Sequence, residues 1–189
     1  FKNWLFEGVY TPDGLTFDVG NATREALTRG HGLSDEYSNG NGSLMRILPL
    51  AFTEASPSDI EAVSSITHAH ATSVEACQLY VDIASRLLKG QQLPEILSGI
   101  ETSKTYARLQ TLAELTEDDI RSTGYVVDTL EAALWCLLTS TSYLETVLKA
   151  VNLGDDTDTV AAVAGGLAGI IYGCLLYTSD AADDMQWVD

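Results

Sequence analysis

The feature that most constrains the fold is an apolar run of small residues that directly follows an acidic loop. The run covers residues 160–173 and is mostly Ala, Gly and Val, and the loop before it covers residues 154–159. Continued to Tyr177, the run reaches the lower length limit of a membrane-spanning helix. Ala and Gly are only weakly hydrophobic, however, and they let neighbouring helices approach closely. We therefore expect a buried helix of a globular core rather than a membrane span.

Capping signals and apolar spacing predict helices along most of the chain. The patterns Ser58-x-x-Glu61, Thr72-x-x-Glu75 and Ser142-x-x-Glu145 have the form of capping boxes, and Asp128-x-x-Glu131 lies early in a further helical run. Lys89-Gly90 is a stop signal for the helix that follows Thr72. Residues 90–124 are more polar and predict shorter, peripheral helices. Because no segment alternates as a strand does, we expect an all-α, compact single domain.

The net charge limits the partners of the protein. A formal charge of −17 on 189 residues repels nucleic acid and anionic lipid, so we expect neither a nucleic acid nor a membrane as a partner. A ligand that carries phosphate would need a bridging cation or backbone N–H groups. Cys77, Cys136 and Cys174 are odd in number and widely spaced, which favours neither a disulfide framework nor a zinc site. This cysteine usage favours a reducing compartment, and we expect a cytoplasmic location. No signal peptide opens the chain and Phe1 is not an initiator Met, so we expect the sequence to begin inside a longer protein.

The acidic loop has two interpretations. Asp156, Asp158 and Thr159 offer three hard oxygen ligands within four residues, as a divalent cation requires. Acids and Thr also cap helices and complement the helix dipole without any ligand. An EF-hand is excluded, because Val160 and Leu167 stand where that loop needs oxygen ligands.

A glycine-rich segment, residues 38–46, is the second candidate site. Its sequence is Ser-Asn-Gly-Asn-Gly-Ser-Leu-Met-Arg, which turns tightly and exposes backbone N–H groups that suit a phosphate or a ribose. It lacks the spacing and the Lys of a P-loop, and a simple turn into a helix would explain it as well. Arg46 could contact an anion, although an Arg beside an apolar run is more often a surface or ion-paired residue.

Two further segments contain candidate side chains. Thr67-His68-Ala69-His70 lies between two expected helices, where a His either contacts a ligand or has a structural role. Two His residues alone are too few for a structural zinc site. Tyr125, at the start of a long helix, either stacks on a ring or packs in the core.

The order of these motifs resembles that of the ADP-ribosylglycohydrolase family. The resemblance extends from about Trp4 to Gly173, and its motifs are GNGSLMR at 40–46, Thr67-His68, GYVVDTLEAALW at 124–135 and AVNLGDDTDTVAAVAGGLAG at 150–169. It implies a compact all-α fold with a site for two magnesium or manganese ions (Mg²⁺ or Mn²⁺). It also implies binding of ADP-ribose and hydrolysis of the bond that joins ADP-ribose to its acceptor.

The resemblance assigns roles to individual residues. It implies Asp156, Asp158 and Thr159 as metal ligands, whereas Asp155 occupies a place usually taken by a small residue. The residues implied to bind the substrate are Gly40, Asn41, Gly42, Ser43, Met45, His68 and Tyr125.

The chain departs from the family pattern at both ends. No Thr-Asp-Asp segment precedes Gly40, so half of the two-metal cage is absent from this sequence, and the general acid or base is expected in that missing part. The family's Asp-x-Gly-x-x-Thr element matches the segment from Asp18 to Thr23. Residues 174–189 resemble a translated sequencing adapter, so we expect a partial family domain at 1–173 and a non-native tail at 174–189.

The expected function is metal-assisted hydrolysis of a glycosidic bond. The intact enzyme would remove ADP-ribose from an ADP-ribosylated protein side chain or from a small ADP-ribosyl conjugate, and this fragment is expected to be inactive alone. One alternative is a non-catalytic ADP-ribose-binding or structural protein on the same scaffold. A magnesium-dependent phosphohydrolase would need HD-type or ExxE-type ligand pairs in its helices, and none is suitably placed.

Overall fold

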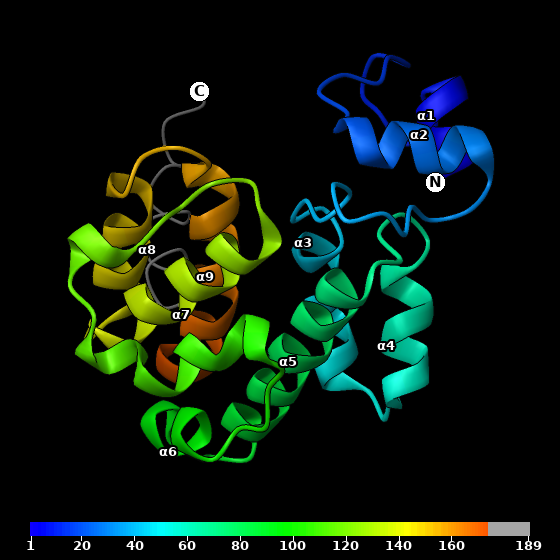
Figure 1. Cartoon of the computed structure of the whole chain (residues 1–189). Helices are drawn as coiled ribbons and strands as arrows, with labels where there is room; N and C mark the ends of the chain where they lie inside the picture. Colours follow the sequence, from blue (N-terminus) through cyan, green and yellow to red (C-terminus); the bar gives the residue numbers. More distant parts are fainter. Residues whose placement is uncertain (174–189) are drawn as a thin grey trace, which may run out of the picture. The chain divides into compact units, whose positions relative to one another are not determined.

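The computed structural model describes residues 1–173, and every regular element in that range is helical (Figure 1). Two isolated bridges, Leu33 with His68 and Gly40 with Tyr125, are the only β-type pairings of the described residues. The predicted all-α class is confirmed. The proposed tail at 174–189, with Cys174, lies outside the described residues. The α-helices are α1 (Lys2–Glu7), α2 (Asn21–Arg29), α3 (Leu44–Ile47), α4 (Pro57–Ser64), α5 (Ala71–Leu88), α6 (Leu93–Ser98), α7 (Val126–Leu138), α8 (Tyr143–Asn152) and α9 (Thr157–Tyr172), and the 3₁₀ helices are η1 (Leu48–Phe52), η2 (Lys104–Glu114) and η3 (Glu117–Asp119).

The chain divides into two compact units. The first contains residues 1–82 and 124–127, and the second contains residues 83–123 and those from 128 onward. In the first unit α1 lies against α2, and α3 lies against η1 and α4. Apolar side chains from these helices form its core, among them Leu27, Leu44, Ile47, Ile60 and Tyr80.

Helix α4 starts two residues before the predicted position. Its N-cap is Ser56, whose hydroxyl accepts from the Asp59 N–H at 3.3 Å while the Asp59 carboxylate accepts from the Ser56 N–H at 2.8 Å. The predicted box at Ser58 is therefore wrong. Pro57 at the first helical position explains the shift, because its fixed φ favours that position and it needs no partner for an N–H.

The start of α5 also differs from the prediction, whereas its end agrees. The helix begins at Ala71, and the N–H of Thr72 donates to Nδ1 of His70, so Thr72 is inside the helix and is not its cap. At the other end Gly90 has a φ of +83°, and its N–H donates to the Leu87 carbonyl at 2.9 Å. This left-handed glycine confirms the predicted stop signal.

The second unit is built around the pair α8 and α9. Val163, Ala164 and Leu167 are buried on α9, as expected for the small-residue run. A β-carbon on Gly165 would lie 3.4 Å from both the Tyr143 hydroxyl oxygen and Cγ2 of Val147, so the missing side chain lets α8 approach closely. The expectation of a core helix is confirmed. None of the helices within residues 1–173 has both the length and the apolar character needed to cross a membrane.

Helix α8 is capped at the predicted residue. Ser142 accepts from the Glu145 N–H at 3.2 Å, while the Glu145 carboxylate accepts from the backbone N–H and the hydroxyl of Thr141. The acid thus binds one residue farther back than in a standard capping box.

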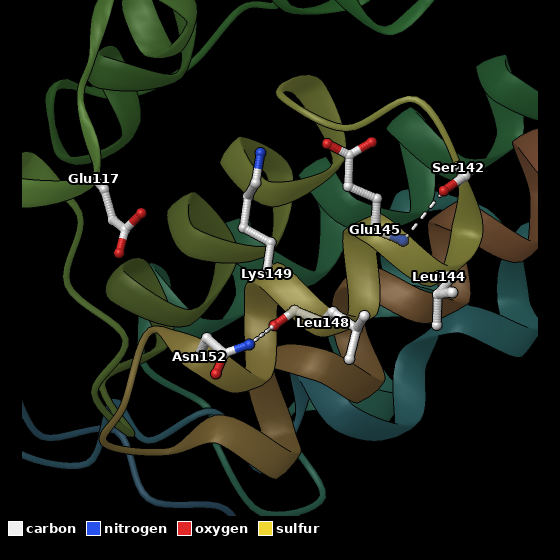
Figure 2. A pocket seen from close by; sticks show the side chains of 7 residues that line it. All are labelled: Glu117, Ser142, Leu144, Glu145, Leu148, Lys149 and Asn152. Atoms are coloured by element: carbon white, nitrogen blue, oxygen red, sulfur yellow. Dashed lines mark hydrogen bonds between the residues drawn. The ribbon is translucent and has the colours of Figure 1, made fainter.

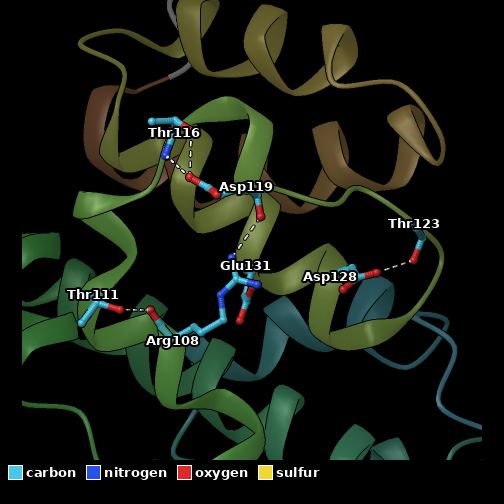
Figure 3. A network of polar contacts seen from close by, with 7 residues as sticks. All are labelled: Arg108, Thr111, Thr116, Asp119, Thr123, Asp128 and Glu131. Atoms are coloured by element: carbon cyan, nitrogen blue, oxygen red, sulfur yellow. Dashed lines mark hydrogen bonds and ion pairs between the residues drawn. The ribbon is translucent and has the colours of Figure 1, made fainter.

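The polar segment before α7 contains short helices, as predicted, and is attached to α7 by polar contacts (Figure 3). Arg108 on η2 lies 3.5 Å from the carboxylate of Glu131 and donates to the Asp119 carbonyl at 3.0 Å. Burial raises the pKa of Glu131, and the Arg108 charge opposes that shift. The indole of Trp135 adds a hydrogen bond to the Leu115 carbonyl. These contacts fix the loop that precedes residue 124.

Candidate functional site

Backbone pairing in the first unit brings the glycine turn, residues 40–43, next to Tyr125. Gly40 and Tyr125 form an antiparallel bridge. The N–H of Asn41 donates to the Gly124 carbonyl, and the N–H of Val126 donates to the Asn39 carbonyl, each at 3.0 Å. Residues that the sequence places far apart thus become neighbours. The Tyr125 side chain stays 42% exposed, so its ring is accessible to a ligand.

His68 lies against the same turn. The residue is only 2% exposed, and its backbone forms a parallel bridge with Leu33. A β-carbon on Gly42 would lie 2.9 Å from Cε1 of His68, and one on Gly40 would lie 3.5 Å from Nε2. The imidazole therefore occupies the space that side chains at these glycines would need. This close approach explains why positions 40 and 42 are glycine, although neither residue has an unusual backbone angle.

The Arg46 guanidinium holds together several segments around the turn. It donates to the carbonyls of Gly42 at 2.7 Å, Val63 at 3.1 Å and Ser64 at 3.2 Å. It also donates to the Thr67 hydroxyl at 2.7 Å and lies 5.6 Å from the centre of the Phe1 ring. Arg46 is thus half-buried and bound to neutral oxygens. The interpretation as a surface or ion-paired residue was wrong, because its partners lie elsewhere in the sequence.

The site also contains a buried asparagine that the sequence analysis did not single out. Asn39 is 5% exposed, and its side-chain oxygen accepts from the Ser73 hydroxyl at 2.8 Å and lies 3.1 Å from Nδ1 of His70. Its amide nitrogen donates to the Glu36 carbonyl at 2.9 Å. Asn39 thereby fixes the residue before the glycine turn. Its position beside Gly40 was the available sequence signal.

Other predicted residues of the turn differ in what they can offer a ligand. The Ser43 side chain is fully buried, and its hydroxyl has no hydrogen-bond partner, so Ser43 can contact a ligand only through its backbone. Met45 is 57% exposed and is accessible from solvent. Asn41 is buried, and its backbone N–H is bound to the Gly124 carbonyl.

Thr23, the last residue of the Asp18 to Thr23 element, lies close to the turn, although it was not predicted as part of the site. A β-carbon on Gly42 would be 3.5 Å from the hydroxyl oxygen of Thr23 on α2. Asp18, just before this helix, has a positive φ of 48°. The sequence signal for this contact was the motif itself. Its Thr lies close to the turn in space although it precedes the turn by about twenty residues.

The acidic loop belongs to the second unit. Gly154 and Asp155 have positive φ values of 91° and 53°. The loop is attached to Ser122, whose hydroxyl donates to the Gly154 carbonyl and whose carbonyl accepts from the Asp156 N–H, each at 3.0 Å. Helix α9 then starts at Thr157, with Asp156 at its N-cap.

This geometry bears on the two interpretations of the loop. The Asp156 side chain makes no capping hydrogen bond, so capping does not explain its carboxylate. Asp158 is exposed in the first turn of α9, where it also complements the helix dipole, and the Thr159 side chain is 6% exposed. Within residues 1–173 no group of three or more His, Cys, Asp or Glu residues could hold a metal ion. The donors are of the type that Mg²⁺ or Mn²⁺ prefers, but they form less than a full cage, and the metal site stays a prediction.

A groove of about 440 Å³ on the second unit contains none of the predicted site residues (Figure 2). It lies along α8 beside Leu144 and Leu148. Its cation, Lys149, already donates to the carbonyl and the hydroxyl of Thr139 and lies 5.4 Å from the centre of the Trp135 ring. The groove therefore does not replace the predicted site.

The sequence and the fold agree with a known family of hydrolases. The model of the ADP-ribosylglycohydrolase family matches residues 1–175, so the chain belongs to this family. It is 37% identical to the ADP-ribosylarginine hydrolase Tri1 of Pseudomonas putida (strain GB-1), over 97% of this chain and 54% of that protein. It is 31% identical to the ADP-ribosyl-[dinitrogen reductase] glycohydrolase of Rhodospirillum rubrum, over 82% of this chain and 56% of that protein.

A solved structure supports the same relationship. A chain of an "ADP-ribosylglycohydrolase-related protein complex" superimposes with a TM-score of 0.67 at 32% identity, covering 82% of this chain and 59% of that one. The chain spans about half the length of the curated relatives that it matches.

Proposed function

We propose that this chain is part of a metal-assisted hydrolase that removes ADP-ribose from a modified protein side chain. An ADP-ribosylated arginine is the first substrate to test, because two similar proteins are named ADP-ribosylarginine hydrolases. Small ADP-ribosyl conjugates are the second class of substrate. The observation that carries the proposal is the meeting of the glycine turn, His68 and Tyr125 in one unit, in a chain that belongs to this family.

The turn suits a diphosphate despite the charge of the protein. A chain with a formal charge of −17 has few cations to spare for an anion, and Arg46 is already bound to four oxygens. Backbone N–H groups at Gly42 and Ser43 would bind the phosphate oxygens instead. The exposed ring of Tyr125 would stack on the adenine, and Met45 would contact the ligand from the surface of α3.

Asp156, Asp158 and Thr159 would hold part of the metal site. When bound, Mg²⁺ or Mn²⁺ would supply Lewis-acid polarisation and a water of lowered pKa. The two carboxylates and the hydroxyl would be the ligands that this loop contributes, and the attachment of the loop to Ser122 would fix the start of α9. The group that moves the proton to the leaving side chain is not assigned to any described residue.

Titration of Mn²⁺ into the 189-residue chain tests the metal proposal, with calorimetry as the readout. We expect weak binding, because only two carboxylates and one hydroxyl contribute, and little hydrolysis of ADP-ribosylarginine. Asp158→Asn should abolish the binding, whereas Asp155→Asn should leave it unchanged because Asp155 is not a proposed ligand. Rapid hydrolysis of ADP-ribosylarginine by this chain would contradict the claim that its metal site is incomplete.

One observation favours the second function, a non-catalytic ADP-ribose-binding protein on the same scaffold. The described residues contain no group of three or more ionisable metal ligands. Binding of ADP-ribose by the whole protein, with no hydrolysis in the presence of Mn²⁺ or Mg²⁺, would support this function over the first. In both cases we propose a cytoplasmic protein with no nucleic acid or membrane partner.

A further inference from the structure

A chain of three hydrogen-bonding groups runs from Arg46 to His68. The guanidinium NH2 group donates to the Thr67 hydroxyl at 2.7 Å, and that hydroxyl oxygen lies 2.7 Å from Nδ1 of His68. Thr67 and His68 are 0% and 2% exposed, so water does not readily replace these contacts. The family resemblance and the proposed function assign no role to Arg46 or Thr67.

The donor and acceptor roles in this chain follow from chemistry. A guanidinium group can only donate, so Thr67 accepts from Arg46. The Thr67 hydroxyl has one proton of its own, and Nδ1 of His68 is the acceptor that the described residues offer to it. A buried hydroxyl that left this proton unpaired would lose a hydrogen bond. Nδ1 is therefore the acceptor, and in a neutral imidazole the ring proton is then on Nε2.

Electrostatics favours the same arrangement. Burial and, as the smaller cause, the charge of Arg46 together lower the pKa of His68 to about 4, so the ring is neutral at pH 7. The positive guanidinium group on the Nδ1 side also disfavours a proton on that nitrogen.

The proton on Nε2 faces the glycine turn. Nε2 lies 3.5 Å from the position of a β-carbon on either Gly40 or Gly42, and no acceptor among residues 1–173 binds it. The residue is only 2% exposed, so few water molecules can reach this donor. This donor is therefore available to an oxygen atom placed in the turn.

We propose that Arg46 and Thr67 are positioning residues that hold His68 in the tautomer with its proton on Nε2, so that this nitrogen donates toward the glycine turn. The identity of the acceptor as an ADP-ribose oxygen rests on the proposed function. The tautomer does not, because it is a property of the protein without ligand.

The test is the tautomer of His68 in the chain labelled with ¹⁵N-histidine. Long-range ¹H–¹⁵N correlation spectra at pH 7 distinguish a protonated from an unprotonated ring nitrogen, and loss of the signals in His68→Gln assigns them. We expect a proton on Nε2 and none on Nδ1. A proton on Nδ1, or on both nitrogens, would overturn the proposal.

Variants of Thr67 test whether its hydroxyl determines the tautomer of His68. Thr67→Val keeps the shape of the side chain but removes the hydroxyl, so we expect a mixture of tautomers. Thr67→Ser should keep the single tautomer. Thr146→Val, which removes an equally buried hydroxyl from α8, is the matched control and should also keep it. An unchanged single tautomer in Thr67→Val would contradict the role of Thr67.

Arg46→Met tests the role of the charge. We expect the pKa of His68, followed by NMR titration, to rise relative to the unmodified chain, and an unchanged pKa would contradict the role of Arg46. Because Arg46 joins several segments, circular dichroism first checks that this variant folds, and the Thr67 variants decide the proposal if it does not.

Binding of ADP-ribose separates this inference from the proposed function. Thr67→Val should weaken the affinity of the whole protein for ADP-ribose by about tenfold, as the loss of one positioned hydrogen bond predicts. A single Nε2–H tautomer with no ADP-ribose binding would support the positioning role and contradict the proposed function. Normal ADP-ribose binding with a proton on Nδ1 would contradict the positioning role alone.

Discussion

At the scale of single residues, the site depends on how closely side chains approach two glycines. The His68 ring lies where a side chain at Gly42 would be, and it is kept neutral by burial and by Arg46. The sequence predicted the glycines and the histidine as site residues. It did not predict Arg46, Thr67 and Asn39 as their supports, because hydrogen bonds such as that from Arg46 to Thr67 join segments distant in sequence.

Gly42→Ala tests this close approach. The added carbon would lie 2.9 Å from Cε1 of His68, so the ring or the turn must move. We expect a loss of about 1–3 kcal/mol in the free energy of unfolding, measured by urea denaturation. Gly169→Ala on α9 is the control, because nothing lies within 4 Å of its added carbon, and it should be neutral or stabilising. Equal effects of the two substitutions would contradict the tight contact.

The pH dependence of stability tests the environment of His68. Its pKa is lowered to about 4, below the ordinary value of 6.5, so between these values the unfolded state binds more protons than the folded state. The stabilising contribution is therefore complete above pH 6.5 and is lost as the pH falls toward 4. It amounts to roughly 3 kcal/mol.

Urea denaturation of the unmodified chain and of His68→Gln at several pH values isolates this contribution. The difference in stability between the two proteins should shrink by most of that amount between pH 7 and pH 4. A difference that stays constant over this range would show that the histidine is not held neutral.

At the scale of elements, local capping chemistry explains which helices the sequence predicted well. The stop at Gly90 and the cap at Ser142 depend on residues adjacent in sequence, and both agree with the structure. The start of α4 was misplaced because two overlapping patterns compete, and Pro57 decides between them. The eleven-residue 3₁₀ helix η2 was predicted only as a short helix, since tertiary contacts such as that of Arg108 with Glu131 hold it.

Paired cap substitutions test the observed start of α4. Ser56→Ala removes the hydroxyl that accepts from the Asp59 N–H, and it should lower the free energy of unfolding by about 1 kcal/mol. Ser58→Ala, at the position that the sequence pattern favoured, should change it by less than about half of that amount. A larger loss of stability in Ser58→Ala than in Ser56→Ala, measured by urea denaturation, would show that Ser58 is the N-cap.

At the scale of the whole molecule, the chain is a member of the ADP-ribosylglycohydrolase family with candidate ligand-binding residues in both compact units. Its sequence predicted the all-α class and the family. Two carboxylates and a hydroxyl at the start of α9 do not by themselves form a metal cage, so the activity of the whole protein is a proposal. The spacing of residues within one loop does not reveal which distant segments contribute further metal ligands.

The most direct test is the release of ADP-ribose from ADP-ribosylarginine by the whole protein that contains this chain, in the presence of Mn²⁺. We expect hydrolysis that chelation of the metal abolishes and that Asp158→Ala lowers by about a hundredfold or more, as the loss of a metal ligand predicts. Asp155→Ala, the adjacent acid, should stay within about threefold of the unmodified rate because it leaves the proposed ligands in place. An unchanged rate in Asp158→Ala would contradict the metal site, and the absence of any hydrolysis by the unmodified protein would contradict the proposed enzyme.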